Sequence, residues 1–106
     1  MKINETVREA FETAKEKGWH ENINPLPELL MKMVTELAEA MEEYRNKTPS
    51  FYIKGGKPEG IEIELADCVI RIMDCFGENG WDLERALRVK MDYNKTRSYK
   101  HGGKVC

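Results

Sequence analysis

Segment 61–78 constrains the fold of this 106-residue chain more than any other, because its helical pattern is apolar on two opposite sides. At 100° per residue, one broad face holds Ile61, Leu65, Cys68, Val69, Ile72 and Phe76, and the opposite face holds Ile63, Ala66, Ile70 and Met73. The narrow polar stripe between them holds Glu64, Asp67, Arg71, Asp74 and Glu78. Such a helix needs partners on two sides. Because few other helices are available, we expect a second subunit to supply one of them.

Helical periodicity predicts three further helices, at about 5–17, 25–45 and 82–97. The first stops at Gly18, and Thr6 with Glu9 matches a capping box. Asn24 is the candidate cap of the second helix and Asp82 that of the fourth. The predicted fold is therefore all-α, a small four-helix bundle that forms one domain over residues 1–106.

Two segments break the helical pattern. Segment 46–60 is rich in proline and glycine and predicts a loop between the second and third helices. Within it, Phe51-Tyr52-Ile53 forms a short strand or covers the core. Segment 98–106 is predicted to be a flexible basic tail.

Composition places the chain among soluble globular proteins, with 41% hydrophobic and 34% charged residues. No apolar run approaches the roughly 18 residues of a membrane span, and the first residues do not resemble a signal peptide, so we expect a cytoplasmic protein. The three cysteines, Cys68, Cys75 and Cys106, lack Cys-x-x-Cys spacing. We expect Cys68 and Cys75 to be reduced and packed in the core.

The charges are unevenly distributed, although the net charge is only −2. Basic residues dominate from Arg85 onward, whereas the central helices carry most of the acids. A basic tail often binds nucleic acid, but here the acidic centre would repel a duplex and no DNA-reading motif is present. A small phosphate ligand, bridged to the acids by metal, fits both halves of the chain better.

Two related acidic tetrapeptides, Glu36-Leu37-Ala38-Glu39 and Glu64-Leu65-Ala66-Asp67, lie in the second and third helices. Carboxylates three apart share a helix face and repel by about 0.2–0.5 kcal/mol. If the two helices pack antiparallel, all four acids face one gap, where a cation would relieve their repulsion. Oxygen-only ligands favour Mg²⁺, with Mn²⁺ as the alternative. A single glutamate is more often a solvated surface residue, but the repeated motif between apolar faces favours a metal site.

Two other kinds of site are excluded. A ferritin-like di-iron centre needs Glu-x-x-His, but Lys17 and Ser98 stand three positions before His20 and His101. A Walker-type phosphate loop is also absent from the sequence. Any nucleotide chemistry must therefore come from the helices.

The fourth helix offers a phosphate-binding stripe of Lys90, Asn94 and Arg97, with Lys95 at its edge. Taken alone, such a stripe is more often a solvated surface. Trp19 and His20 follow the first helix and offer a stacking ring and a hydrogen-bonding tip for a nucleoside. The competing interpretation of Trp19 is a plug in the core.

The acidic motifs, separated by 24 residues, precede Lys90-Met91-Asp92-Tyr93-Asn94-Lys95-Thr96-Arg97 and His101-Gly102-Gly103-Lys104. Together with Gly18-Trp19-His20-Glu21, this pattern resembles the MazG-like family of all-α nucleoside triphosphate pyrophosphohydrolases over nearly the whole chain. The resemblance implies that the four acids bind Mg²⁺, that Lys90 and Asn94 help to hold the triphosphate, and that subunits pair to complete each site. It also implies cleavage between the α and β phosphates, which releases a nucleoside monophosphate and pyrophosphate.

The functional hypothesis is metal-assisted phosphoryl transfer to water in a homodimer or homotetramer. Glu39 is the first candidate to orient the attacking water, and Glu36 is the second. The alternative is a non-catalytic helical module that senses nucleotides or binds a partner protein through its spare apolar face. The sequence predicts neither the base nor the sugar of the nucleotide.

Overall fold

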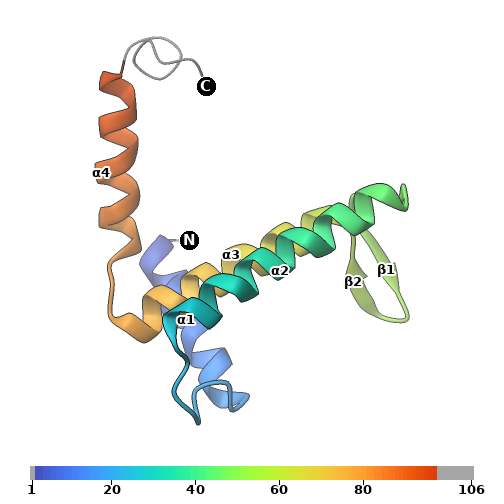
Figure 1. Cartoon of the computed structure of the whole chain (residues 1–106), viewed down its shortest axis with the longest axis horizontal. Helices are drawn as coiled ribbons and strands as arrows, with labels where there is room; N and C mark the ends of the chain where they lie inside the picture. Colours follow the sequence, from blue (N-terminus) through green and yellow to red (C-terminus); the bar gives the residue numbers. More distant parts are fainter. Residues whose placement is uncertain (1, 98–106) are drawn as a thin grey trace.

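The computed structural model describes residues 2–97 and consists mainly of helices (Figure 1). Its elements are α1 (Ile3–Glu16), α2 (Leu26–Arg45), β1 (Tyr52–Lys54), β2 (Lys57–Glu59), α3 (Ile61–Asn79) and α4 (Leu83–Thr96). The four predicted helices are thus present in this part of the chain, and a small hairpin interrupts the segment predicted as a loop. No helix within residues 2–97 combines the length and apolar character needed to cross a bilayer.

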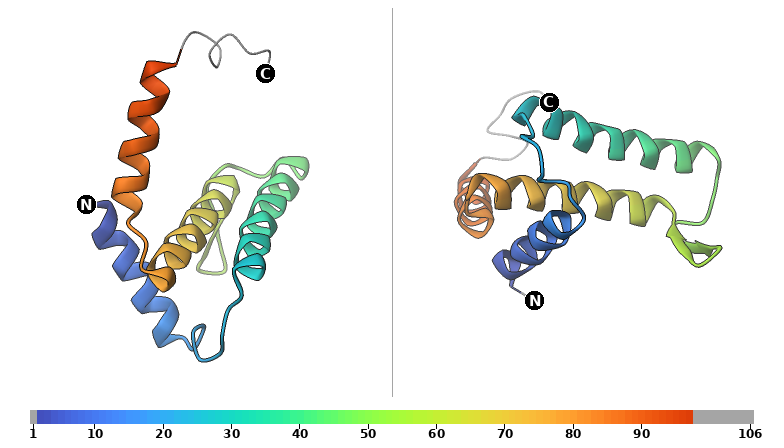
Figure 2. Two further views of the ribbon diagram at one scale, coloured as in Figure 1. Left: turned by 60° about the vertical axis from the view of Figure 1, so that its left-hand side comes forward. Right: turned by 90° about the horizontal axis from the view of Figure 1, so that it is seen from below.

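Helix α3 lies at the centre of the fold, as its two apolar faces predict. Helix α2 runs antiparallel beside it, and α1 crosses its other side (Figure 2). The thiols of Cys68 and Cys75 are free and buried in this core, as predicted, while Cys106 lies outside the described residues. Gly80 ends α3 in the left-handed conformation (φ 68°), which a glycine adopts without steric cost.

Helix α4 leaves the other three helices and extends away from them (Figures 1 and 2). Its beginning is held by hydrogen bonds to the first turn of α1. The backbone N–H of Asn4, which has no partner inside its own helix, donates to Glu84 at 2.8 Å, and the Asn4 amide donates to Asp82 at 3.0 Å. Within one chain, the four helices therefore do not close into the compact bundle that the sequence predicts.

The helix caps agree with the sequence in part. The Asp82 side chain caps α4 by accepting from the backbone N–H of Arg85 at 2.9 Å. The predicted capping box is wrong, because α1 begins earlier and Thr6 lies inside it, donating to the Lys2 carbonyl. Pro25, not Asn24, precedes α2. The Asn24 amide instead donates to the backbone carbonyl of Trp19 at 2.9 Å.

The hairpin pairs β1 and β2 antiparallel, with Tyr52 opposite Glu59. Gly55 and Gly56 form its two-residue turn, and both have positive φ, as the tight turns of hairpins require. Phe51 and Ile53 remain more than half exposed. Of the two sequence interpretations, the strand is therefore confirmed, and the segment does not cover the core.

Helix α2 does not turn its main apolar pattern fully toward α3, although Leu26, Leu30, Met33, Leu37, Met41 and Tyr44 recur at the three- and four-residue spacing of one helix face. Its buried residues are Leu29, Glu36 and Ala40. In that pattern, Leu30, Leu37 and Met41 are about half exposed. Val34 of α2 and Leu65 and Val69 of α3 are exposed to a similar degree, and we refer to these six residues as the apolar stripe. Among residues 2–97, no side chain is less than 2% exposed, so the core of the single chain is thin.

Gly77 allows α1 to approach α3 closely. A Cβ atom at this position would lie only 2.6 Å from the Cβ atom of Phe11. We predict that Gly77→Ala lowers the free energy of unfolding by about 1–3 kcal/mol through overpacking. Chemical denaturation measures this change.

The control is Ala66→Gly, at an exposed position of the same helix. It reports helix propensity alone, which favours alanine over glycine by about 1 kcal/mol. If Gly77→Ala stabilised the protein by that amount, α1 would not pack against Gly77 as described.

Candidate metal centre

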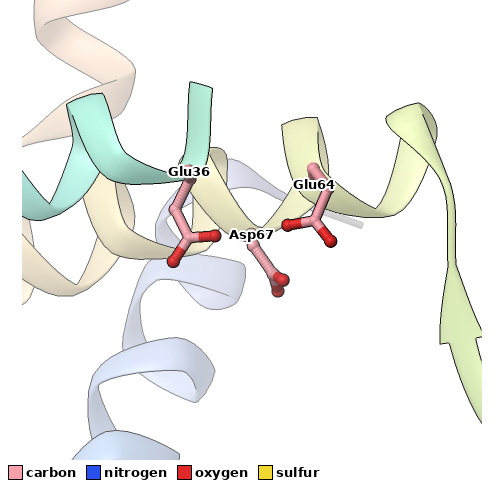
Figure 3. Close-up of side chains that lie close together, drawn as sticks. All are labelled: Glu36, Glu64 and Asp67. Atoms are coloured by element: carbon pink, nitrogen blue, oxygen red, sulfur yellow. The ribbon is translucent and has the colours of Figure 1, made fainter. Parts of the chain in front are cut away.

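Three of the four predicted acids converge between α2 and α3. Glu36 projects from α2, and Glu64 and Asp67 project from successive turns of α3 into the same space (Figure 3). One carboxylate oxygen from each lies within 4.8 Å of the other two. Glu36 is only 6% exposed, so this charge is held inside the helix interface. The spacing of the acids and the antiparallel packing of the two helices produce this arrangement together.

The electrostatics of Glu64 reflect this crowding. Burial, a hydrogen bond with Glu39 and the charges of Glu39, Asp67 and Glu36 raise the pKa of Glu64 to about 7. Glu39 itself is exposed and lies outside the converging triad, but it contacts Glu64 directly. The Glu64 Oε2 atom is buried and has no hydrogen-bond partner within residues 2–97. An oxygen in this condition is suited to receive a cation.

Asp67 shows a similar but weaker effect. Burial and the neighbouring Glu36 charge raise the pKa of Asp67, while the positive charges of Arg71 and Lys57 oppose the change. The raised pKa values of Asp67 and Glu64 have the same physical origin, which is partial burial of several carboxylates in one place. A divalent cation bound between these acids would lower the pKa values of both Glu64 and Asp67.

Arg71 supplies the main positive charge at this site. Its Nε donates to Glu36 Oε1 at 2.7 Å, and its guanidinium carbon lies 4.7 Å from the ring centroid of Trp19. Arg71 therefore connects the α1–α2 loop to the buried carboxylate of α2. One arginine cannot balance Glu36, Glu64 and Asp67 together.

A second acidic group adjoins the first and shares Glu64 with it. Oxygens of Glu43, Glu59 and Glu64 also lie within 4.8 Å of one another. Glu43 accepts hydrogen bonds from Thr48 Oγ1 at 2.7 Å and Tyr52 Oη at 2.9 Å, and these bonds lower the pKa of Glu43. The hairpin thus holds Glu43 ionised and brings Glu59 to the edge of the candidate metal centre.

Two hollows meet at Trp19, next to the acids. A cavity of about 160 Å³ is lined by Trp19, Glu36, Asp67, Ile70 and Arg71. A larger, mainly apolar groove of about 350 Å³ lies between α1 and α3 and also includes Trp19 and Ile70. Trp19 is 50% exposed, so it forms a wall of these hollows and is not a plug in the core.

The other predicted substrate-binding residues lie elsewhere in the single chain. Lys90, Asn94 and Lys95 are exposed on α4, which extends away from α2 and the acids (Figure 1). Lys90 Nζ and the Arg97 guanidinium carbon lie 5.0 Å and 5.7 Å from the ring centroid of Tyr93. The structure therefore does not bring this stripe to the carboxylates of its own chain.

His20 has different partners from those the sequence suggested. Its Nε2 lies 2.7 Å from Asp74 Oδ1, and its Nδ1 lies 3.1 Å from Glu78 Oε1. Because both ring nitrogens already face carboxylates of α3, the ring is engaged in anchoring the α1–α2 loop. It does not line the cavity beside Trp19.

Sequence reasoning gave no role to three residues that shape the site: Glu43, Glu59 and Arg71. Two of them carried a signal, since Glu43 is one turn beyond Glu39 and Arg71 is one turn beyond Asp67 on the same helix faces. Glu59 carried none, because its position depends on how the hairpin folds back toward α3.

Comparisons of this chain with models of protein families, with curated proteins and with solved structures found no match.

The raised pKa of Glu64 has a consequence for stability. Between the ordinary value of 4.5 and the value of about 7, the folded protein keeps a proton that the unfolded chain has released. The stability of the metal-free protein therefore falls as the pH rises through this range. We predict that Glu64→Gln removes this part of the pH dependence and raises the unfolding temperature at pH 8 by a few degrees.

Thermal unfolding at pH values on both sides of this range measures the effect. Glu42→Gln is the matched control, since the Glu42 side chain is 63% exposed on α2 and lies outside both acidic groups. An identical pH profile for Glu64→Gln and the parent protein would contradict the assignment.

Proposed function

We propose that this chain is a Mg²⁺-dependent nucleoside triphosphate pyrophosphohydrolase of the MazG-like all-α type, acting in the cytoplasm. It would convert a nucleoside triphosphate to the monophosphate and pyrophosphate. The observation that carries this proposal is the convergence of Glu36, Glu64 and Asp67, together with the buried Glu64 Oε2 atom, which has no hydrogen-bond partner among residues 2–97.

The chemistry of the acids fits a hard divalent cation. Glu36, Glu64 and Asp67 supply only oxygen ligands, which suit Mg²⁺ and also Mn²⁺ better than zinc or copper. Such an ion neutralises phosphate charge and makes water a stronger nucleophile. Glu43 and Glu59 lie close enough to Glu64 to extend the set of ligands toward the hairpin.

Glu39 is the best placed residue to orient the attacking water. It is exposed, contacts Glu64 and lies outside the converging triad, so its carboxylate is not required as a ligand. Glu36, the second candidate, is buried and already bonded to Arg71, which leaves it less free for this role.

The hollows beside Trp19 fit the nucleoside portion of the substrate. The cavity lined by Trp19 and Asp67 connects an aromatic ring to the acidic centre, and the adjoining groove between α1 and α3 is mainly apolar. An aromatic base stacks favourably on an indole ring, by about 1–3 kcal/mol in known cases. The phosphates would then point toward the carboxylates and their bound ion.

The predicted phosphate-binding stripe of Lys90, Asn94, Lys95 and Arg97 requires a second subunit in this proposal. Helix α4 extends away from the acids of its own chain, so it would serve the site of a neighbour. The half-exposed apolar stripe on α2 and α3 supports assembly into a homodimer or homotetramer, because water-exposed leucine, valine and methionine side chains gain by association.

The same apolar stripe favours one alternative, a non-catalytic module that senses nucleotides or binds a partner protein. Thermal unfolding with Mg²⁺ and a mixture of nucleotides distinguishes the possibilities. A ligand at 100 times its dissociation constant stabilises the folded state by about 2.7 kcal/mol. A higher unfolding temperature without release of pyrophosphate indicates a nucleotide sensor. An unchanged unfolding temperature indicates a partner-binding module.

We predict that Asp67→Asn and Glu39→Gln each reduce Mg²⁺-dependent pyrophosphate release by at least about 100-fold, since they remove a ligand and the residue that orients water. A screen of ribo-, deoxy- and modified triphosphates first identifies the substrate. Circular dichroism then verifies that helical content is unchanged. Glu42→Gln should retain full activity, and turnover in both site variants would refute the proposed centre.

Complementation tests whether α4 serves the neighbouring subunit. We predict that the Lys90→Ala variant has a higher KM for the triphosphate. The variant therefore loses most of its turnover when the substrate concentration is limiting. Co-expression with Asp67→Asn should restore roughly a quarter of parental activity in a dimer, because half of the dimers are mixed and each mixed dimer has one intact site. Without restoration, Lys90 does not act across a subunit interface. Unchanged kinetics for Lys90→Ala would exclude phosphate binding by this residue.

A further inference from the structure

His20, whose side chain is buried, attaches the connection between α1 and α2 to α3, beside contacts of Trp19 and Asn24 with the same helix. The imidazole of His20 lies between Asp74 and Glu78, which are one turn apart on α3, and the His20 and Asp74 side chains are each only 9% exposed. The ring of Phe11 from α1 lies 4.9 Å from the His20 ring. The histidine is therefore enclosed by α1, α3 and its own loop.

Both carboxylate contacts of the ring can be hydrogen bonds only when each ring nitrogen carries a proton. A neutral imidazole has one N–H group and one lone pair, so it can donate to only one carboxylate. Whichever tautomer formed, the other nitrogen would direct its lone pair at the second carboxylate. The imidazolium form can donate to both carboxylates, at 2.7 Å to Asp74 and 3.1 Å to Glu78. A neutral ring with its proton on Nε2 would keep the Asp74 bond and could accept from the Asn24 amide at 3.3 Å, but it would set its lone pair against Glu78. The two carboxylates therefore favour the imidazolium form.

The charged surroundings agree with this conclusion. Within residues 2–97, the charged groups that act on the ring are Asp74 and Glu78 of α3, whereas α1 contributes the uncharged ring of Phe11 and the loop contributes the uncharged amide of Asn24. Burial alone would lower the pKa of His20, but the two carboxylates outweigh it, so the pKa is raised above 6.5. Glu78 Oε2 is buried without a hydrogen-bond partner in the described chain, so this carboxylate depends on its other oxygen, which faces His20.

The histidine is linked directly to the wall of the candidate site. Trp19 precedes His20 in the chain and lies over Arg71, which is bonded to the buried Glu36. The Asn24 amide donates to the Trp19 carbonyl at 2.9 Å and lies 3.3 Å from Glu78 Oε1. These contacts hold the loop residues on both sides of His20 to one another and to α3. Movement of His20 away from α3 would therefore carry Trp19 with it.

We propose that His20 is a proton-operated latch, which holds the α1–α2 loop on Asp74 and Glu78 and thereby keeps Trp19 seated on Arg71. Protonation closes the latch and loss of the proton loosens it. Because the folded form binds this proton more tightly than the unfolded chain, the latch stabilises fully at pH values below 6.5, and its contribution disappears as the pH rises through the raised pKa. The latch does not depend on the proposed catalytic activity.

Nuclear magnetic resonance of the full chain tests the latch. The variant His101→Gln leaves one histidine, and Glu64→Gln removes the carboxylate that titrates in the same range, so a chain with both changes reports on His20 alone. We expect the imidazole signal to titrate with a midpoint above 6.5, and the indole N–H signal of Trp19 to shift with the same midpoint. Trp81→Phe identifies which of the two indole signals belongs to Trp19.

Variants of the partners make the assignment specific. In the same background, Asp74→Asn should lower the His20 midpoint by about one pH unit, a tenfold loss of proton affinity, because it removes one charged partner. His20→Gln should abolish the pH-dependent shift of the Trp19 signal. A midpoint at or below 6.5, or a Trp19 signal that does not follow the histidine, would overturn the proposal even if the variants of the partners failed to fold.

Discussion

The repulsion among carboxylates packed between α2 and α3 is the interaction on which the rest of the structure depends. Glu36 is buried in this interface beside Glu64 and Asp67, and Arg71 is the main cation that faces them. Below about pH 7 a proton on Glu64 relieves part of the remaining charge, because burial and the neighbouring carboxylates raise the pKa of Glu64 to about 7. A helix interface that holds excess negative charge is unfavourable for folding alone. Under the proposed function, a bound cation would complete the charge balance of this interface.

The position of these acids also explains why the single chain has a thin core. When Glu36 and Ala40 of α2 face α3, residues such as Leu37 and Met41 must turn outward, because one helix face cannot point in two directions. The apolar stripe and the acidic centre are therefore two results of one helix rotation. A chain that placed its leucines inward would have a better core but no converging carboxylates.

The polar stripe of α3 has two distinct roles along its length. Its first half holds Glu64 and Asp67 in the acidic centre. Its second half holds Asp74 and Glu78 against the histidine of the α1–α2 loop. Arg71 lies between the two halves and contacts Trp19, so the loop and the acidic centre share one continuous set of polar contacts. This continuity connects the protonation of the loop to the shape of the candidate site.

The sequence by itself determined the features that arise from neighbouring residues. Periodicity and capping define α3 and the start of α4 at Asp82, and the spacing of the acids places them on common helix faces. Tertiary structure decided which face of α2 meets α3, because Leu29 and Leu30 lie on different faces of α2 and are equally apolar. It also decided the partners of His20 and the direction in which α4 leaves the other helices. These features depend on contacts between segments far apart in the chain. Local patterns carry no information about which of several apolar or charged surfaces will meet.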